Sequence, residues 1–135
     1  MATEVRIKIR WRDMDAYGHV NNAVYLNYLE ECRDRAIESL MGTQGSWDFV
    51  LAHVGIDFKN ELTQDDEEIT VRCAIAGIGR SSVRTRESIV KADGTISAHA
   101  EAVVVPRDRA RGGSRPLTDA VRATLRTAIE ASLDS

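Results

Sequence analysis

Residues 22–41, NAVYLNYLEECRDRAIESLM, decide the fold, because this is the one long stretch of the chain with a helical period. Asn21 or Asn22 is a suitable N-cap, and Gly42 is a suitable stop after Met41. Apolar side chains recur three or four positions apart and form one face: Tyr25, Tyr28, Leu29, Cys32, Ala36 and Leu40. The opposite face is charged and carries Glu30, Arg33, Asp34 and Glu38. The sequence predicts one long amphipathic helix.

Strand patterns precede and follow this helix. Residues 4–12, EVRIKIRWR, alternate strictly and place Val5, Ile7, Ile9 and Trp11 on one face. After a polar loop at 42–46, further strand patterns occupy residues 48–62, 67–79, 81–92 and 95–106. In the first of these, Val50, Ala52, Val54, Ile56 and Phe58 share a face; in the second, Ile69, Val71, Cys73 and Ile75 do. ADG at 92–94 predicts a tight turn, and Pro106 ends the last strand.

The order of these elements is strand, helix and then four strands, which predicts an α+β fold. Strands joined by short turns pair antiparallel, and the one long helix must cover the apolar face of their sheet. Residues 107–116, RDRARGGSRP, predict a mobile polar loop. Thr118 then caps a short C-terminal helix with Val121, Leu125 and Ile129 on its apolar face. We expect residues 1–135 to form a single domain, of which 108–135 are the polar loop and the final helix.

Composition argues against several classes of partner. The net charge is −3 and aromatic residues make up 5% of the chain, so we expect no nucleic acid. No signal peptide and no apolar run of membrane-spanning length occurs, so we expect a cytoplasmic protein without a membrane partner. Cys32 and Cys73 lack metal-ligand spacing and lie among apolar neighbours, which predicts reduced core thiols and no metal site.

The polar stretch DMDAYGHVNN at 13–22 lies where a predicted strand meets the helix. A helix N-terminus presents free backbone N–H groups that stabilise an anion or a developing oxyanion. Gly18 allows a sharp turn or close approach to a ligand. A carboxylate near such a helix end, such as Asp15, can act as general base or nucleophile on an acyl carbonyl. The same residues are also ordinary turn and cap formers, and residue types alone leave that alternative open.

RWRDMDAYGHVNNAVYLNYLEECR at 10–33 resembles the opening signature of hotdog-fold acyl-CoA thioesterases, in the branch that includes 4-hydroxybenzoyl-CoA thioesterase. The resemblance continues through residues 50–108, where IGRSS at 78–82 matches the family's strand series. It implies a hotdog fold, a five-stranded antiparallel sheet wrapped around one long central helix. The fold derived above from the order of elements agrees with it.

The resemblance also implies site residues. The family's catalytic carboxylate is the second Asp of its D-x-D element, which is Asp15, as nucleophile or as the base that activates water. The backbone N–H that polarises the thioester carbonyl matches Asn22. His19 is assigned carbonyl polarisation or loop ordering, and Tyr17 and Gly18 shape the same loop. Arg80 is expected to pair with a phosphate of coenzyme A, with hydrogen bonds from Ser81 and Ser82.

The function implied is hydrolysis of an acyl-CoA thioester to a carboxylic acid and coenzyme A, without a cofactor or metal. Members of the family pair sheets edge to edge with the site between subunits, which implies a homodimer or homotetramer. Three alternatives stay open: a non-catalytic acyl-CoA-binding protein, an acyl-carrier-protein thioesterase of the same fold, and dehydration of a hydroxyacyl thioester. Glu30 or Glu31 is a second candidate carboxylate, although a solvated or ion-paired helix residue fits both positions.

Overall fold

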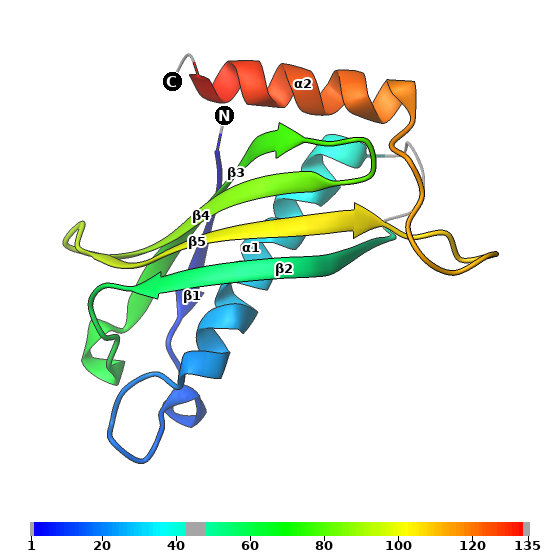
Figure 1. Cartoon of the computed structure of the whole chain (residues 1–135). Helices are drawn as coiled ribbons and strands as arrows, with labels where there is room; N and C mark the ends of the chain where they lie inside the picture. Colours follow the sequence, from blue (N-terminus) through cyan, green and yellow to red (C-terminus); the bar gives the residue numbers. More distant parts are fainter. Residues whose placement is uncertain (1, 43–47, 134–135) are drawn as a thin grey trace.

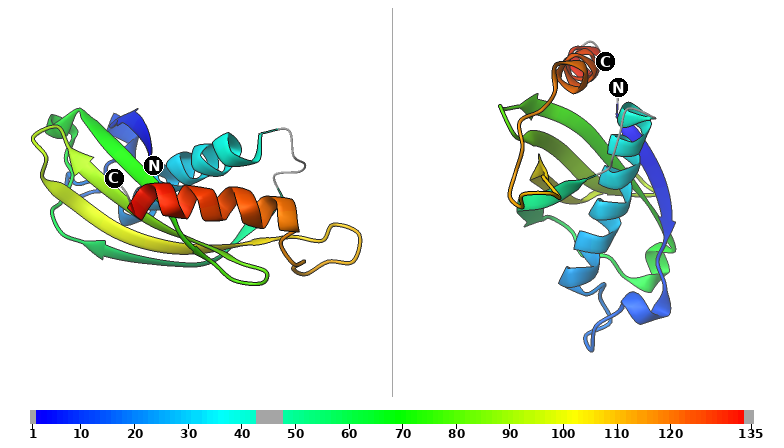
Figure 2. Two further views of the ribbon diagram at one scale, coloured as in Figure 1. Left: turned by 90° about the horizontal axis from the view of Figure 1, so that it is seen from above. Right: turned by 90° about the vertical axis from the view of Figure 1, so that its right-hand side faces the viewer.

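The computed structural model describes residues 2–42 and 48–133 and contains an antiparallel sheet with helices on one face and at one end. The strands are β1 (Thr3–Lys8), β2 (Phe49–Phe58), β3 (Glu68–Ile78), β4 (Val83–Lys91) and β5 (Ile96–Pro106). Helix α1 (Asn22–Met41) packs on β1, β3 and β4, and α2 (Asp119–Leu133) packs on β3 and α1. Figures 1 and 2 show α1 behind the sheet and α2 across its upper end. The predicted α+β hotdog architecture is confirmed.

The ends of α1 are those that its flanking residues predict. Asn21 is the N-cap, and its side-chain oxygen accepts a hydrogen bond from the Ala23 N–H at 2.9 Å. Gly42 is the C-cap at φ 52°, a backbone conformation that favours glycine. The polar loop predicted at 42–46 lies outside the described residues except for Gly42.

The sheet order is β1-β3-β4-β5-β2, and every neighbouring pair is antiparallel. The chain therefore leaves α1, forms β2 at one edge, and returns through η2 (Gln64–Asp66) to β3 beside β1. The turn predicted at 92–94 is present, with Gly94 at φ 89° and the Thr95 N–H bonded to Asp93. The predicted buried row of β3 is confirmed at Ile69, Val71, Cys73 and Ile75.

The prediction that Trp11 shares the buried face of the first strand is wrong. β1 ends at Lys8, and the short helical turn η1 (Trp11–Asp13) follows it. The turn rotates Trp11 out of the alternation, and its side chain is 78% exposed. Asp13, at the end of the same turn, is buried instead.

The predicted face of β2 is also wrong in its first half. A β-bulge between Leu51 and His53 shifts the register against β5, so one extra residue changes which side chains share a face. Leu51 pairs with buried Val104, on the same face as Val54, Ile56 and Phe58, whose partners are buried alanines. Val50 lies on the other face, and Ala52 has no ladder partner.

The segment at 107–116 contains hydrogen bonds of its own. Arg107 and Ser114 form an isolated antiparallel bridge, and the Asp108 N–H bonds to the Gly113 carbonyl at 2.9 Å. The predicted loop therefore forms a hydrogen-bonded turn, and its mobility stays a prediction. Thr118 caps α2 through the Val121 N–H, as expected. No helix in the described ranges is long and apolar enough to cross a membrane.

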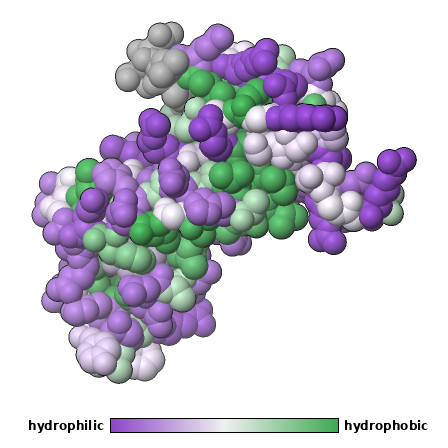
Figure 3. Space-filling model, in the orientation of Figure 1, coloured by the Kyte–Doolittle hydropathy of each residue, from purple (hydrophilic) through white to green (hydrophobic). Residues whose placement is uncertain are grey.

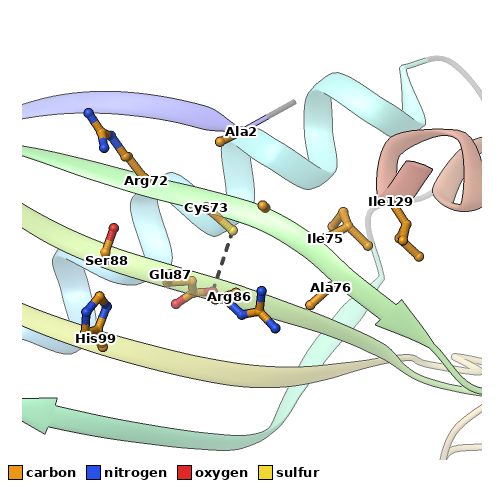
Figure 4. Close-up of a pocket in the computed structure, with 11 residues that line it drawn as sticks. Ala2, Arg72, Cys73, Ile75, Ala76, Arg86, Glu87, Ser88, His99 and Ile129 are labelled. Atoms are coloured by element: carbon orange, nitrogen blue, oxygen red, sulfur yellow. Dashed lines mark hydrogen bonds between the residues drawn. The ribbon is translucent and has the colours of Figure 1, made fainter. Parts of the chain in front are cut away.

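A buried ion pair joins α1 to the sheet. The Arg33 guanidinium donates to both carboxylate oxygens of Glu87 on β4, at 2.7 and 2.9 Å, and Thr85 donates to the same carboxylate at 2.6 Å. The assignment of Arg33 to the exposed charged face is therefore wrong. Figure 4 shows Glu87 and Cys73 joined by a weaker Sγ–carboxylate hydrogen bond. Because removing one partner of a buried pair leaves the other charge unsatisfied, loss of either side chain is expected to destabilise the packing of α1 on the sheet.

We expect Glu87→Gln to destabilise the protein by about 3–5 kcal/mol, because the buried Arg33 charge then lacks its counter-charge. Equilibrium unfolding in urea measures the change. The matched control is Glu31→Gln, which removes an exposed pair with Arg35 on the same helix and is expected to cost under about 0.5 kcal/mol. Equal losses for both variants would contradict a stabilising role for the buried pair.

Candidate functional site

The loop before α1 is a small antiparallel ribbon. Its rungs are the Asn21 N–H to the Asp13 carbonyl at 2.9 Å, the bridge between Met14 and Val20, and the Asp15 N–H to the His19 carbonyl at 2.7 Å. The base of the ribbon is therefore bonded to the N-cap of the helix. Asp15 lies two residues from that base, a span of about 7 Å in extended chain.

The Asp15 carboxylate orders the tip of this ribbon. One oxygen, Oδ1, accepts the Tyr17 N–H at 2.9 Å and the His19 N–H at 3.2 Å, and the Gly18 N–H closes a turn to the Asp15 carbonyl. Gly18 has φ 84°, which requires glycine-like freedom at the turn. Among the described residues, nothing donates a hydrogen bond to the second carboxylate oxygen of Asp15. Asp15 therefore has a turn-forming oxygen and an oxygen left for chemistry.

The first amides of α1 present the electrostatics that the sequence predicts. The side-chain oxygen of Asn21 accepts the Ala23 N–H, and its backbone carbonyl accepts the Val24 N–H. The N–H of Asn22, the first helical residue, has no acceptor within the described ranges. This amide lies at the positive end of the helix and is available to an anionic oxygen.

Asp13 anchors the ribbon from beneath. Its carboxylate is 2% exposed and accepts hydrogen bonds from the Tyr28 hydroxyl at 2.6 Å and from the Arg10 backbone N–H at 3.0 Å. The Arg10 guanidinium adds bonds at 3.3 and 3.1 Å. Sequence reasoning gave Asp13 no part beyond a turn, whereas the structure makes it the most heavily bonded side chain of the loop.

These contacts shift the pKa values of Asp13 and Tyr28. Burial alone raises the pKa of Asp13, but the hydrogen bonds from Tyr28 and Arg10 outweigh it and hold the pKa below its ordinary value. Burial and the neighbouring Asp13 carboxylate raise the pKa of Tyr28 far above its usual range. Asp13 is thus a carboxylate and Tyr28 a phenol donor at neutral pH.

A second set of contacts holds the other side of the ribbon. The Val20 N–H bonds to the Leu62 carbonyl at 2.8 Å, and the Leu62 N–H bonds to the buried Tyr25 hydroxyl at 3.1 Å. His19 Nε2 lies 3.0 Å from a carboxylate oxygen of Glu61. The connection after β2 therefore orients His19, and Glu61 is a contact that no local sequence pattern indicated.

The remaining predicted site residues lie apart from this loop in the single chain. Arg80, Ser81 and Ser82 form the turn between β3 and β4, at the opposite end of the sheet from residues 13–22 (Figure 1). The Gly79 N–H bonds to the Ser82 carbonyl, and the Arg80 carbonyl accepts the Leu117 N–H. One chain brings Asp15, Tyr17, Gly18, His19 and Asn22 together, but not the turn at 80–82.

Other reactive groups are not arranged as a second centre. A hollow of about 360 Å³ on β3 and β4 is lined by Arg72, Arg86, Ser88 and His99, among others, and includes no predicted site residue (Figure 4). Cys32 and Cys73 are buried and unpaired, as predicted. Burial and the nearby Glu87 charge raise the pKa of Cys32 to about 12 and that of Cys73 further. The described part of the chain holds no group of three or more His, Cys, Asp or Glu side chains suited to a metal ion.

Comparison with known proteins identifies the class. The sequence profile of the thioesterase-like superfamily matches residues 9–125, so the chain belongs to that superfamily and is a thioester hydrolase of hotdog fold. Among solved structures, a thioesterase from Thermus thermophilus complexed with coenzyme A and zinc is 31% identical, with a TM-score of 0.84 over 95% of this chain and 94% of that one. A predicted thioesterase from Bacillus stearothermophilus is 25% identical, with a TM-score of 0.86 over 96% and 97%.

A curated relative gives the comparison in sequence. The long-chain acyl-CoA thioesterase FadM of Escherichia coli (strain K12) is 28% identical over 102 residues, which cover 72% of this chain and 76% of FadM.

The lowered pKa of Asp13 predicts a pH dependence of stability. The unfolded chain binds the proton at its ordinary pKa of 3.8, above the folded value, so the stability that Asp13 contributes is present above that pH. It is lost as the pH falls through the lowered folded pKa. Wild type and Asp13→Asn are unfolded in urea from about pH 6 to about pH 2, and the difference in their free energies of unfolding is expected to shrink on acidification.

Asp65→Asn is the control for this series, because it changes an exposed carboxylate of the η2 turn. Its free energy of unfolding should stay close to that of wild type. A difference between wild type and Asp13→Asn that grows toward low pH would contradict the assignment.

Proposed function

We propose that the protein hydrolyses acyl-CoA thioesters in the cytoplasm, with Asp15 as general base or nucleophile and the Asn22 amide as oxyanion donor. Asp15 keeps one carboxylate oxygen without a donor, the Asn22 N–H has no acceptor among the described residues, and the ribbon that joins them has a fixed register. Support for the substrate comes from FadM, a long-chain acyl-CoA thioesterase, and from the coenzyme A bound to the Thermus relative. The observation that carries the proposal is that Asp15 and the helix start belong to one hydrogen-bonded unit.

The chemistry follows from these two groups. As a base, Asp15 takes a proton from water while the water oxygen attacks the acyl carbon. As a nucleophile, its own oxygen attacks that carbon and displaces the coenzyme A thiolate, and water then cleaves the resulting anhydride. Either route collects negative charge on the carbonyl oxygen, where the Asn22 N–H stabilises it. The carbon–sulfur bond then breaks, and the coenzyme A thiolate takes up a proton. His19, whose Nε2 lies 3.0 Å from Glu61, would polarise the same carbonyl or order the loop.

Exposed apolar side chains near the loop suit an acyl group. Phe58 is 50% exposed at the end of β2, where its ring packs edge-on against Tyr25 at 5.0 Å. Leu26 on α1 and Ile96 on β5 are also exposed, and Tyr17 at the ribbon tip is 85% exposed. These side chains offer apolar contact area for a hydrocarbon chain.

We propose that the active form is a homo-oligomer, a homodimer or a homotetramer, built by pairing β2 edges. β2 is ten residues long, lies at the sheet edge, and leaves Val50 and Leu51 each 42% exposed. Figure 3 shows hydrophobic surface along this edge. Long apolar edges favour pairing with another strand.

Such pairing would also bring the coenzyme A contacts to the site. A symmetric pairing that keeps the helices on one face runs antiparallel, so the Phe49 end of one β2 meets the Phe58 end of the other. The Phe49 end adjoins the arginine-rich segment, since the Arg107 N–H bonds to Asp48 and the Leu117 N–H bonds to Arg80. The Phe58 end adjoins the ribbon through Leu62 and Glu61. Arg80, Ser81 and Ser82 of one subunit would then serve the Asp15 of its partner.

We expect Asp15→Asn to lower kcat for acyl-CoA hydrolysis by about a hundredfold or more, because the variant lacks the base or nucleophile. Free thiol release measures the rate, and calorimetric titration with coenzyme A checks that binding is retained. The matched control is Asp93→Asn, which changes another turn-forming aspartate, bonded to the Thr95 N–H on a hairpin. Unchanged hydrolysis in Asp15→Asn would place the chemistry at a different centre, whereas no hydrolysis by wild type would leave a non-catalytic acyl-CoA-binding protein.

The same assay run with acyl-carrier-protein thioesters separates the two carriers. A kcat/KM for the carrier-protein thioester far above that for the matched acyl-CoA would replace coenzyme A as the proposed carrier.

We expect Leu51→Lys to shift the protein toward monomer and to lower activity in step, because a buried lysine is disfavoured at a paired apolar edge. Sedimentation velocity measures the assembly state. Ala123→Lys, on the exposed side of α2, is the control and should change neither. A fully active monomer would contradict a site built from two subunits.

A further inference from the structure

We propose that Asp13 and Tyr28 are positioning residues of the hydrolase: together they fix the reach of Asp15 to the start of helix α1. The inference rests on the proposed role of Asp15 and adds residues that touch neither substrate nor the reacting atoms. Its basis is that Asp13 is bonded to the same helix at two separate points.

The first point of attachment is the side chain. Tyr28 lies within the second turn of α1, and its hydroxyl donates to Asp13 Oδ2 at 2.6 Å. Helical side chains lean toward the helix N-terminus, which lets a tyrosine at this position reach the segment that precedes the helix. Tyr28 is 3% exposed and Asp13 2% exposed, so water does not compete for this bond.

The second point is the backbone. The Asp13 carbonyl accepts the N–H of Asn21, the residue that caps α1. A residue bonded to a rigid helix at both Asn21 and Tyr28 cannot translate or rotate freely relative to that helix. One bond alone would leave a pivot; two bonds on different atoms of Asp13 remove it.

The ribbon transmits this placement to Asp15. Asp15 follows Asp13 by two residues, and the rungs from Met14 to Val20 and from Asp15 to His19 make the intervening chain stiff. A shift or tilt of Asp13 is therefore carried to the Asp15 carboxylate rather than absorbed by the loop. Catalytic groups are sensitive to such shifts, because a displacement of about 1 Å costs up to about a hundredfold in rate.

Arg10 completes the anchor from the solvent side. Its guanidinium bonds Asp13 Oδ1, and its side chain is 55% exposed while that of Asp13 is buried. This contact neutralises the buried carboxylate and adds a third attachment that holds Asp13 in place.

The test uses Tyr28→Phe, which deletes one hydroxyl and keeps the ring in the core. Thr85→Val is the matched control, because it deletes a buried hydroxyl bonded at 2.6 Å to Glu87, away from the ribbon. We expect Tyr28→Phe to lower kcat at least about tenfold with KM changed by less than about twofold. Thr85→Val should lose a similar amount of thermal stability and keep kcat. Amide hydrogen exchange at residues 14–21 should accelerate in Tyr28→Phe only.

A double variant tests whether Tyr28 acts through Asp15. If it does, Tyr28→Phe added to Asp15→Asn causes no further loss of rate, because the group that Tyr28 positions is already gone. Additive losses would overturn the positioning role. A wild-type kcat in Tyr28→Phe, with Asp15→Asn inactive, would also overturn the positioning role. That result would leave the proposed function intact. Full activity of Asp15→Asn itself would instead defeat the proposed function and the positioning role with it.

Should Tyr28→Phe fail to fold, Arg10→Ala decides the matter, because it weakens the same anchor from an exposed position. The expected result is a lowered kcat with faster exchange at residues 14–21. Unchanged kcat despite faster exchange would show that movement of the anchor does not reach Asp15.

Discussion

The hydrogen bond from the Tyr28 hydroxyl to the buried Asp13 carboxylate is the contact on which the arrangement of the loop depends. It joins the core face of α1 to the segment that enters the helix, so packing of the helix on the sheet also sets the geometry of the loop. The bond is well suited to this task because both groups keep the protonation states that it requires: the pKa of Asp13 is lowered and that of Tyr28 is raised. A neutral pair would be weaker at the same distance.

Helix α1 makes a second buried polar contact, so it is held at two positions along its length. Tyr28 fixes the first turns against Asp13, and Arg33 fixes the middle against Glu87 on β4. Apolar packing alone tolerates small sliding and rotation of a helix on a sheet, because many neighbouring arrangements bury nearly equal area. The Tyr28–Asp13 and Arg33–Glu87 bonds lie at different positions along the helix, and both can form in only one arrangement of the helix on the sheet. Each carboxylate is satisfied only there, and an unsatisfied one is costly.

Much of the fold can be predicted from the sequence, and the predictions that fail share a cause. The ends of α1, the buried row of β3 and the turn at 92–94 follow from local period and cap residues. The predicted faces of Trp11 and Val50 are wrong because a helical turn and a β-bulge interrupt an alternation that looks continuous in the sequence. The roles of Tyr28 and Glu61 depend on partners distant in sequence, so local pattern shows Tyr28 only as one more apolar position of the helix and Glu61 only as part of a strand.

Under the proposed function, the position of the ribbon relative to β2 would explain why the site needs a second subunit. α1 covers β1, β3 and β4, so the apolar face of β2 near Phe58 is left open beside the loop that carries Asp15. A hydrocarbon chain bound there would keep one side in water and gain little from burial. Under the proposed pairing of β2 edges, the partner subunit would cover the same surface and supply the arginines that one chain places at its far end. The contact between the two β2 edges would then both close the acyl surface and bring the coenzyme A contacts to the site. Loss of assembly and loss of activity are therefore expected to coincide.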